Sequence, residues 1–64
     1  MTRTQQIDHI LELLSSVWKK HPEQRLGQLI DNSTYLFYKD LFLIDDDTMT
    51  LALQNVLVKG GFVE

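Results

Sequence analysis

Proline at position 22 divides the N-terminal half of the chain into two helical segments. A residue before proline is pushed out of the helical conformation, and proline is favoured at the first position of a new helix. The sequence therefore predicts a helix over about residues 5–20 and a shorter one over 22–31. In the shorter helix, Leu26, Leu29 and Ile30 form a narrow apolar stripe, which we expect at the centre of a small core.

The first predicted helix is amphipathic. Its apolar residues occupy an arc of about 160°, and polar residues fill the opposite side. This arc predicts that Trp18 lies in the core, and Thr2 and Gln5 have the spacing of a capping box at its start. The arc consists of Ile7, Ile10, Leu11, Leu13, Leu14, Val17 and Trp18.

A third helix is predicted over residues 46–59. Aspartates accept hydrogen bonds from free N–H groups at a helix N-terminus, and Gly60 is suited to a left-handed C-cap. Leu51 and Val58 lie seven residues apart on the reverse face, which should be polar in a monomer. Either residues 35–44 cover them or a second protein does, and the second alternative makes them candidate partner-binding residues. The core stripe of this helix is predicted to be Met49, Ala52, Leu53, Val56 and Leu57.

The connector over residues 33–45 is rich in aromatic residues and allows two interpretations. Its composition is compatible with a β-strand, but it lacks clean alternation, so we favour an irregular or single-turn helical segment that plugs the helices. Tyr35 and Tyr38 fit either a lid over the core or a partner contact. The expected plug residues are Leu36, Phe37, Leu41, Phe42 and Ile44.

Length and composition indicate one small all-α domain spanning residues 1–64, with three helices. A chain of 64 residues without cysteine has little core and no disulfide to support it, which favours self-association or a protein partner. A net charge of −3 with no basic cluster beyond Lys19 and Lys20 makes nucleic acid an unlikely partner. We expect a cytoplasmic protein with no membrane contact, because no apolar run approaches ~20 residues.

Candidate chemistry is sparse. Asp40, Asp45, Asp46 and Asp47 form an acidic surface that could bind Ca²⁺ or Mg²⁺, but the glycine and glutamate of a calcium loop are missing, and helix capping explains these residues better. His9 and Glu12 supply too few ligands for zinc, and Ser15-Ser16 has no histidine base within one helical turn. We therefore expect no enzyme activity, metal or cofactor.

The middle of the chain carries a candidate structural clasp. Arg25 and Gln28 are the polar residues of the second predicted helix, and arginine is suited to pairing with the carboxylates of Asp31, Asp40 or residues 45–47. Gly27 inside the helix predicts the close approach of another backbone. A recognition patch is the functional alternative for Arg25 and Gln28.

Two motifs carry a family resemblance. The pattern Trp18-x-x-x-Pro22-x-x-Arg25-Leu26-Gly27-Gln28-Leu29, followed by Asp40-Leu41-Phe42-x-Ile44-x-Asp46, resembles short bacterial and phage proteins of unknown function. Those proteins have W-x-x-x-P-D-x-R-L-G-Q-L and then D-L-F-Y-I-E-D. Glu23, Leu43 and Asp45 depart mildly from that pattern. The resemblance implies a small helical protein and supplies no activity.

Three functional hypotheses follow. The first is a non-enzymatic protein-interaction module that self-associates or binds a protein partner. The second is a phage-type inhibitor that presents the acidic surface to a nucleic-acid-binding protein. The third is a helix-turn-helix DNA binder, which the two acidic residues of the predicted 22–31 helix disfavour.

Overall fold

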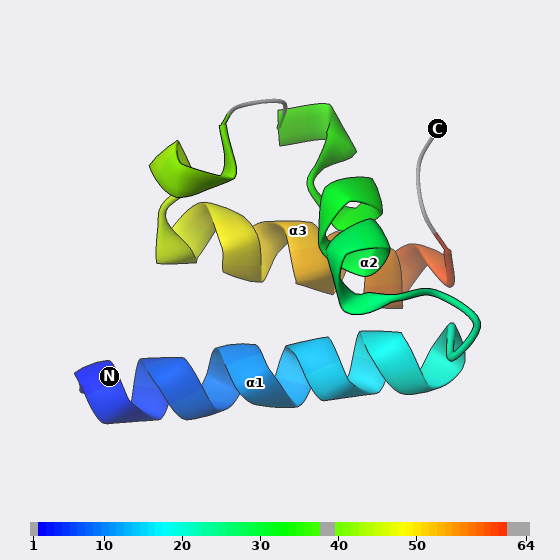
Figure 1. The fold of residues 1–64 in the computed structure, drawn as a ribbon. Coiled ribbons are helices and arrows are strands. Elements are labelled where there is room, and N and C mark those ends of the chain that lie inside the picture. Colours follow the sequence, from blue (N-terminus) through cyan, green and yellow to red (C-terminus); the bar gives the residue numbers. More distant parts are fainter. Residues whose placement is uncertain (1, 38–39, 62–64) are drawn as a thin grey trace.

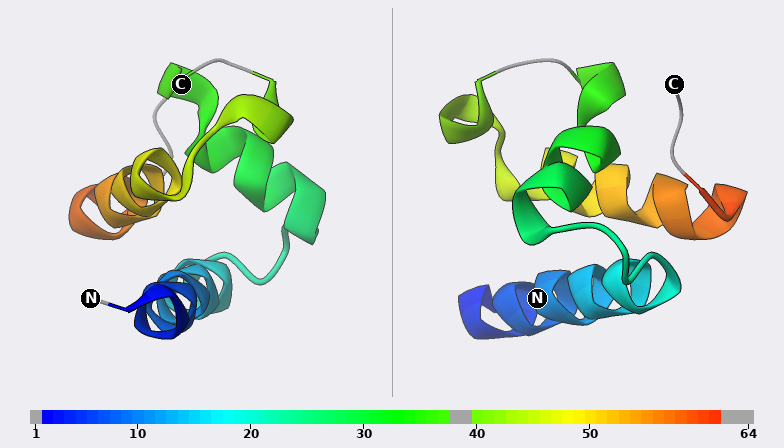
Figure 2. Two further views of the ribbon diagram at one scale, coloured as in Figure 1. Left: turned by 90° about the vertical axis from the view of Figure 1, so that its left-hand side faces the viewer. Right: turned by 45° about the vertical axis from the view of Figure 1, so that its right-hand side comes forward.

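Three α-helices and two single-turn 3₁₀ helices make up the fold. The computed structural model describes residues 2–37 and 40–61, and the chain order is α1 (Arg3–Lys20), α2 (Leu26–Ser33), η1 (Tyr35–Phe37), η2 (Leu41–Leu43) and α3 (Asp46–Lys59). Helices α1 and α3 run side by side in the same direction, and α2 lies across them (Figure 1). Seen along α1, the three helices form a triangle (Figure 2, left). The predicted all-α three-helix architecture is confirmed.

Helix α1 begins two residues earlier than predicted because its cap lies at Thr2. The Thr2 hydroxyl accepts from the Gln5 N–H at 3.2 Å, and the Gln5 side chain accepts from the Thr2 N–H at 2.9 Å. This reciprocal pair is the capping box that the spacing predicted. The helix ends at Lys20, as expected before His21-Pro22.

Helix α2 was predicted over 22–31, and both of those bounds are wrong. Residues 21–25 instead form a turn, in which the Gln24 N–H donates to the His21 carbonyl at 3.1 Å. The Trp18 indole N–H donates to the Gln24 carbonyl at 2.8 Å and ties this turn to α1. At the other end, the Ser33 hydroxyl donates to the Leu29 carbonyl, a bond compatible with a continuing helix.

Helix α3 matches its predicted bounds. The Asp45 carboxylate accepts from the Thr48 N–H at 2.7 Å, and Asp46 and Asp47 place negative charge in the first turn, where it suits the helix dipole. Gly60 ends the helix with φ at 72°, in the left-handed region that favours glycine.

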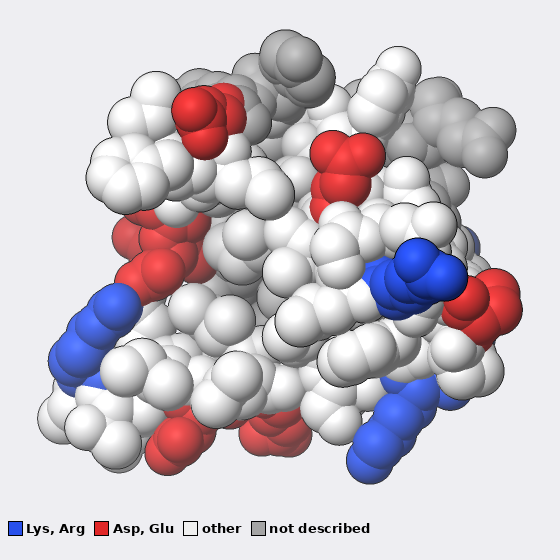
Figure 3. All heavy atoms as spheres, viewed as in Figure 1, with Lys and Arg blue, Asp and Glu red and all other residues white. Residues whose placement is uncertain are grey.

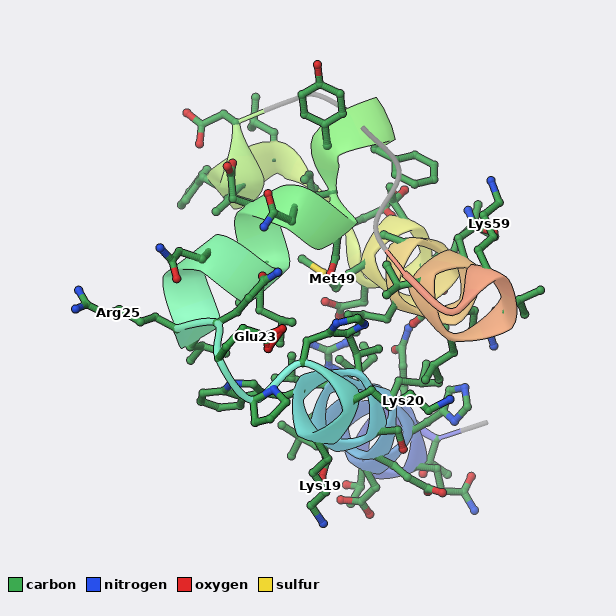
Figure 4. The ribbon with its side chains drawn as sticks, turned by 90° about the vertical axis from the view of Figure 1, so that its right-hand side faces the viewer. Lys19, Lys20, Glu23, Arg25, Met49 and Lys59 are labelled. Carbon is green, nitrogen blue, oxygen red and sulfur yellow. The ribbon has the colours of Figure 1, made fainter. Side chains whose placement is uncertain are left out.

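The core lies between α3 and the inner sides of α1 and α2. Of the three leucine and isoleucine residues expected at its centre in α2, Leu29 is fully buried, Ile30 is partly buried and Leu26 is exposed. The late start of α2 explains this, because Leu26 is its first residue and lies at the edge of the core. Met49 lies between α2 and α3 (Figure 4). The buried hydrophobic residues in the described part are Val17, Leu29, Ala52, Leu53 and Val56.

The connector forms two isolated 3₁₀ turns, which confirms the irregular or single-turn interpretation. No strand occurs within residues 2–37 and 40–61. The plug interpretation is wrong for Leu41 and Phe42, because both are exposed, Phe42 at 91%. Asp40 caps η2 by accepting from the Phe42 N–H at 3.0 Å, and this turn points the Leu41–Leu43 segment away from the core. The side chain of Leu36 lies outside the described part.

Candidate interaction surface

The predicted clasp between Arg25 and the acidic residues is not formed. Arg25 is exposed and makes no ion pair with the described aspartates, and Figure 4 shows its side chain extending away from the molecule. Its backbone N–H donates to the Gln28 side chain at 3.0 Å, so the two residues cap the start of α2. A Cβ on Gly27 would meet nothing within 4 Å, so no backbone approaches it. The turn over residues 21–25 places Arg25 away from the acidic residues.

The ion pair with an acidic residue that the sequence predicted for Arg25 is formed by Arg3 instead. Its guanidinium pairs with the Asp46 carboxylate and joins the first turns of α1 and α3. The Gln6 amide donates to Asp47 at 3.3 Å between the same two helices. Because Asp45 and Asp40 serve as helix caps, each of the four predicted acidic-surface residues has a structural role.

Metal and nucleophile candidates find no support in the geometry. Within residues 2–37 and 40–61, no group of three or more His, Asp or Glu side chains is placed to hold a metal ion. Glu12 is exposed on α1, and His9 is only partly buried. Ser15 is exposed as well.

The exposed apolar residues are the most distinctive feature of the surface. Single exposed hydrophobic residues are ordinary, but contiguous groups mark binding sites. Leu51 and Val58 are exposed on α3, Val58 at 85%, so the described part of the connector does not cover them, and Tyr35 is exposed in η1. Tyr38 lies outside the described residues. The other exposed large hydrophobic residues are Ile7, Leu11, Trp18, Leu26, Leu41, Phe42 and Leu43.

One group of these residues lines a groove along α1. The groove has a volume of about 380 Å³ and, apart from Ser15 and Lys19, an apolar lining. Leu11 is 56% exposed and Trp18 37% exposed, so both side chains are accessible from solvent. The turn that follows α1 supplies Pro22 at one end, and the Trp18–Gln24 hydrogen bond fixes that turn. We call this the α1 groove, lined by Leu11, Leu14, Ser15, Trp18, Lys19 and Pro22.

The surface over α1, α2 and η2 has an uncharged centre. Figure 3 shows mostly uncharged atoms across the middle of this face, and most of the charged side chains lie around its edge, although one acidic group lies in its upper part and one basic group in its right part. Protein interfaces commonly combine an apolar centre depleted of charge with a polar rim. The distribution therefore resembles that of an interface.

The sequence analysis missed the α1 groove because it assigned the whole apolar arc of α1 to the core. The signal that could have found it is the spacing of Ile7, Leu11, Leu14 and Trp18 by four, three and four residues. At 100° per residue, this outer stripe is centred about 90° from Val17, the fully buried residue of α1. Two stripes at this angle can contact different neighbours.

Comparison with protein-family models, curated proteins and solved structures gives no significant match for this chain. The resemblance to short bacterial and phage proteins therefore stays a prediction. None of the described helices has the length and apolar character needed to cross a membrane.

Proposed function

We propose that the protein is a small, non-enzymatic protein-interaction module that binds its partner at the α1 groove. The observation that carries this proposal is the exposure of Leu11 and Trp18 in one apolar groove on the longest helix. Burial of apolar surface is the main driving force of association, and tryptophan is enriched among the residues that dominate binding. A partner that covers these two side chains would remove their apolar surface from water, and this change favours binding.

The groove is also held in shape before a partner arrives. Its residues lie on a continuous helix and on a turn fixed by the Trp18–Gln24 hydrogen bond. A preformed site loses less conformational entropy on binding than a disordered one. Leu51 and Val58 on α3, and Tyr35 in η1, form separate exposed positions that we propose as secondary contacts.

The two other hypotheses have less support. The acidic-surface inhibitor would use Asp40 and Asp45–Asp47, which already cap helices or bridge α1 and α3. For the helix-turn-helix, the exposed Arg25 and Gln28 at the start of α2 could reach bases, but the chain carries a net charge of −3. Phosphate neutralisation needs a basic surface.

Site-specific photo-crosslinking tests the proposal. A photoreactive residue replaces Leu11 in the full chain, which is expressed in the cells that naturally make it and also studied after purification at high concentration. We expect a discrete adduct at position 11 and none with the same probe at Gln54, an exposed polar residue of α3. The mass of the adduct distinguishes a second copy from another protein.

The Ser15→Arg variant is the matched control for groove occupancy. Ser15 is exposed and lines the groove, so arginine fills the groove without removing a core contact. We expect this variant to remain folded by circular dichroism and to lose the position-11 adduct. An adduct that survives Ser15→Arg, or position 11 reacting no more than Gln54, would overturn the proposal.

A further inference from the structure

We infer that the α1 groove is occupied by the α1 helix of a second copy of this chain, packed antiparallel about a two-fold axis. This inference rests on the proposed function and names its partner. The two copies would contact one another through the outer stripe of α1 and the uncharged surface next to it (Figure 3).

The spacing of the outer stripe matches a helix–helix seam. Ile7, Leu11, Leu14 and Trp18 follow the four-three-four pattern of coiled-coil contact positions. In an antiparallel pair, Ile7 of one copy lies opposite Trp18 of the other, and Leu11 lies opposite Leu14. The bulky Trp18 thus meets an aliphatic residue at each end of the seam. The stripe is therefore complementary to itself, as a two-fold interface requires.

The order of charges along the stripe selects the antiparallel direction. Asp8, Glu12 and Lys19 are exposed along the same edge of the outer stripe, with the acids in the first half of α1 and the lysine near its end. In the antiparallel register, Asp8 is offset from Lys19 of the other copy by two residues, or about 3 Å along the axis. Figure 4 shows Lys19 extending outward from α1, away from α2 and α3. In a parallel pair, the charged edges of the two copies would lie on opposite sides of the seam, and these charges would not meet.

The size of the domain also favours a second copy. The described part buries only five hydrophobic residues, which is a small core for a chain without disulfides. A standard interface buries about 800 Å² on each partner, about one sixth of the 4752 Å² surface. Leu26, Leu41 and Phe42 add exposed apolar area on α2 and η2, so the stripe is not the only apolar surface that can contribute.

Thiol crosslinking tests the direction, since the chain has no cysteine of its own. Asp8→Cys and Lys19→Cys are made as separate variants and treated with a short bis-maleimide, alone and mixed. We expect a covalent dimer in the mixture and little in either variant alone. The mixed antiparallel dimer keeps one intact Asp8–Lys19 pair at the other end of the seam. Crosslinking within each single variant, but not between them, would indicate a parallel pair and overturn the inference.

Sedimentation equilibrium tests the charge pattern independently. Two exposed ion pairs contribute little each, so we expect Lys19→Glu to weaken dimerisation about three- to tenfold and the Asp8→Lys/Lys19→Glu double variant to restore it. Gln54→Arg, at an exposed polar position of α3, should leave the dimer unchanged. A monomeric mass at millimolar concentration overturns the inference. In that case, a photo-adduct with another protein leaves the proposed function standing, and no adduct removes both.

Discussion

The two apolar sides of α1 have similar compositions and different environments. Val17 on the inner side is fully buried against residues of α2 and α3, and Ile10, Leu13 and Leu14 pack around it, although Leu14 also lines the α1 groove. Leu11 on the outer side is 56% exposed, although it lies on the same apolar arc. The difference arises from the neighbours: α3 runs alongside one side of α1, and the described part of the chain supplies no helix of similar length for the other side (Figures 1 and 2).

The position of α2 explains why the outer side stays open. Had α2 begun at Pro22, its first turn would have followed directly on α1. It begins instead at Leu26, after a turn that is bonded to Trp18. Hydrophobic periodicity therefore identifies a helix and its apolar arc, whereas tertiary contacts decide which part of that arc is core.

The largest expected effect is a difference in the free energy of unfolding between two variants, one with a new carboxylate on the buried side of α1 and one with a new carboxylate on its open side. Val17→Glu buries an unpaired carboxylate and should cost more than about 4 kcal/mol, enough to unfold most of a domain this small. Leu11→Glu introduces the same group at an exposed position and should change the free energy of unfolding by less than about 1 kcal/mol. Circular dichroism with urea denaturation measures both variants, at a concentration low enough to keep the protein monomeric.

A folded Val17→Glu variant, or equal destabilisation by the two substitutions, would contradict the division of α1 into buried and open sides. Comparing Leu11→Glu at low and high protein concentration sharpens the result. If the outer side binds a second copy, only the wild-type protein should gain stability as its concentration rises.

A second pair of variants compares a buried and an exposed apolar residue in the same way on α3. Leu53 is almost fully buried and Leu51 is half exposed two residues earlier on the same helix. We expect Leu53→Ala to lower the free energy of unfolding by about 2–5 kcal/mol through lost burial and a residual cavity. Leu51→Ala should lower it by less than about 1 kcal/mol. Urea denaturation of both proteins provides the measurement, and a Leu51→Ala cost equal to that of Leu53→Ala would show that this face is covered.

Local signals in the sequence predicted the fold where they act over a few residues. The Thr2–Gln5 capping box, the Asp45 cap and the left-handed Gly60 each depend on adjacent backbone, and each is found where expected. The start of α2 was predicted at Pro22, where the structure has a turn over residues 21–25. An indole hydrogen bond from Trp18 to Gln24, six residues away, ties this turn to α1, and no local pattern indicates that contact.

The candidate surface was predicted only in part. Leu51 and Val58 interrupt the polar side of α3 and were expected to be covered by residues 35–44 or by a second protein; they are exposed, so the described part of the connector does not cover them. Leu11 and Trp18 were expected in the core, since their positions on the arc do not reveal that α3 covers only its inner side. The α1 groove thus depends on how the helices are arranged, and a single helix pattern does not contain that information.

The smallest expected effect is the difference in the free energy of unfolding between alanine variants of two arginines, one that bridges two helices and one that does not. Arg3 pairs with Asp46 and also donates to Gln6 at 3.1 Å, but its side chain is largely exposed. Arg3→Ala should therefore lower the free energy of unfolding by about 0.2–1 kcal/mol, and the loss should shrink in high salt. Arg25→Ala should have no salt-dependent effect, because this side chain forms no ion pair with the described carboxylates. Urea denaturation at two salt concentrations tests both, and a salt-sensitive loss for Arg25→Ala would support the clasp that the sequence predicted.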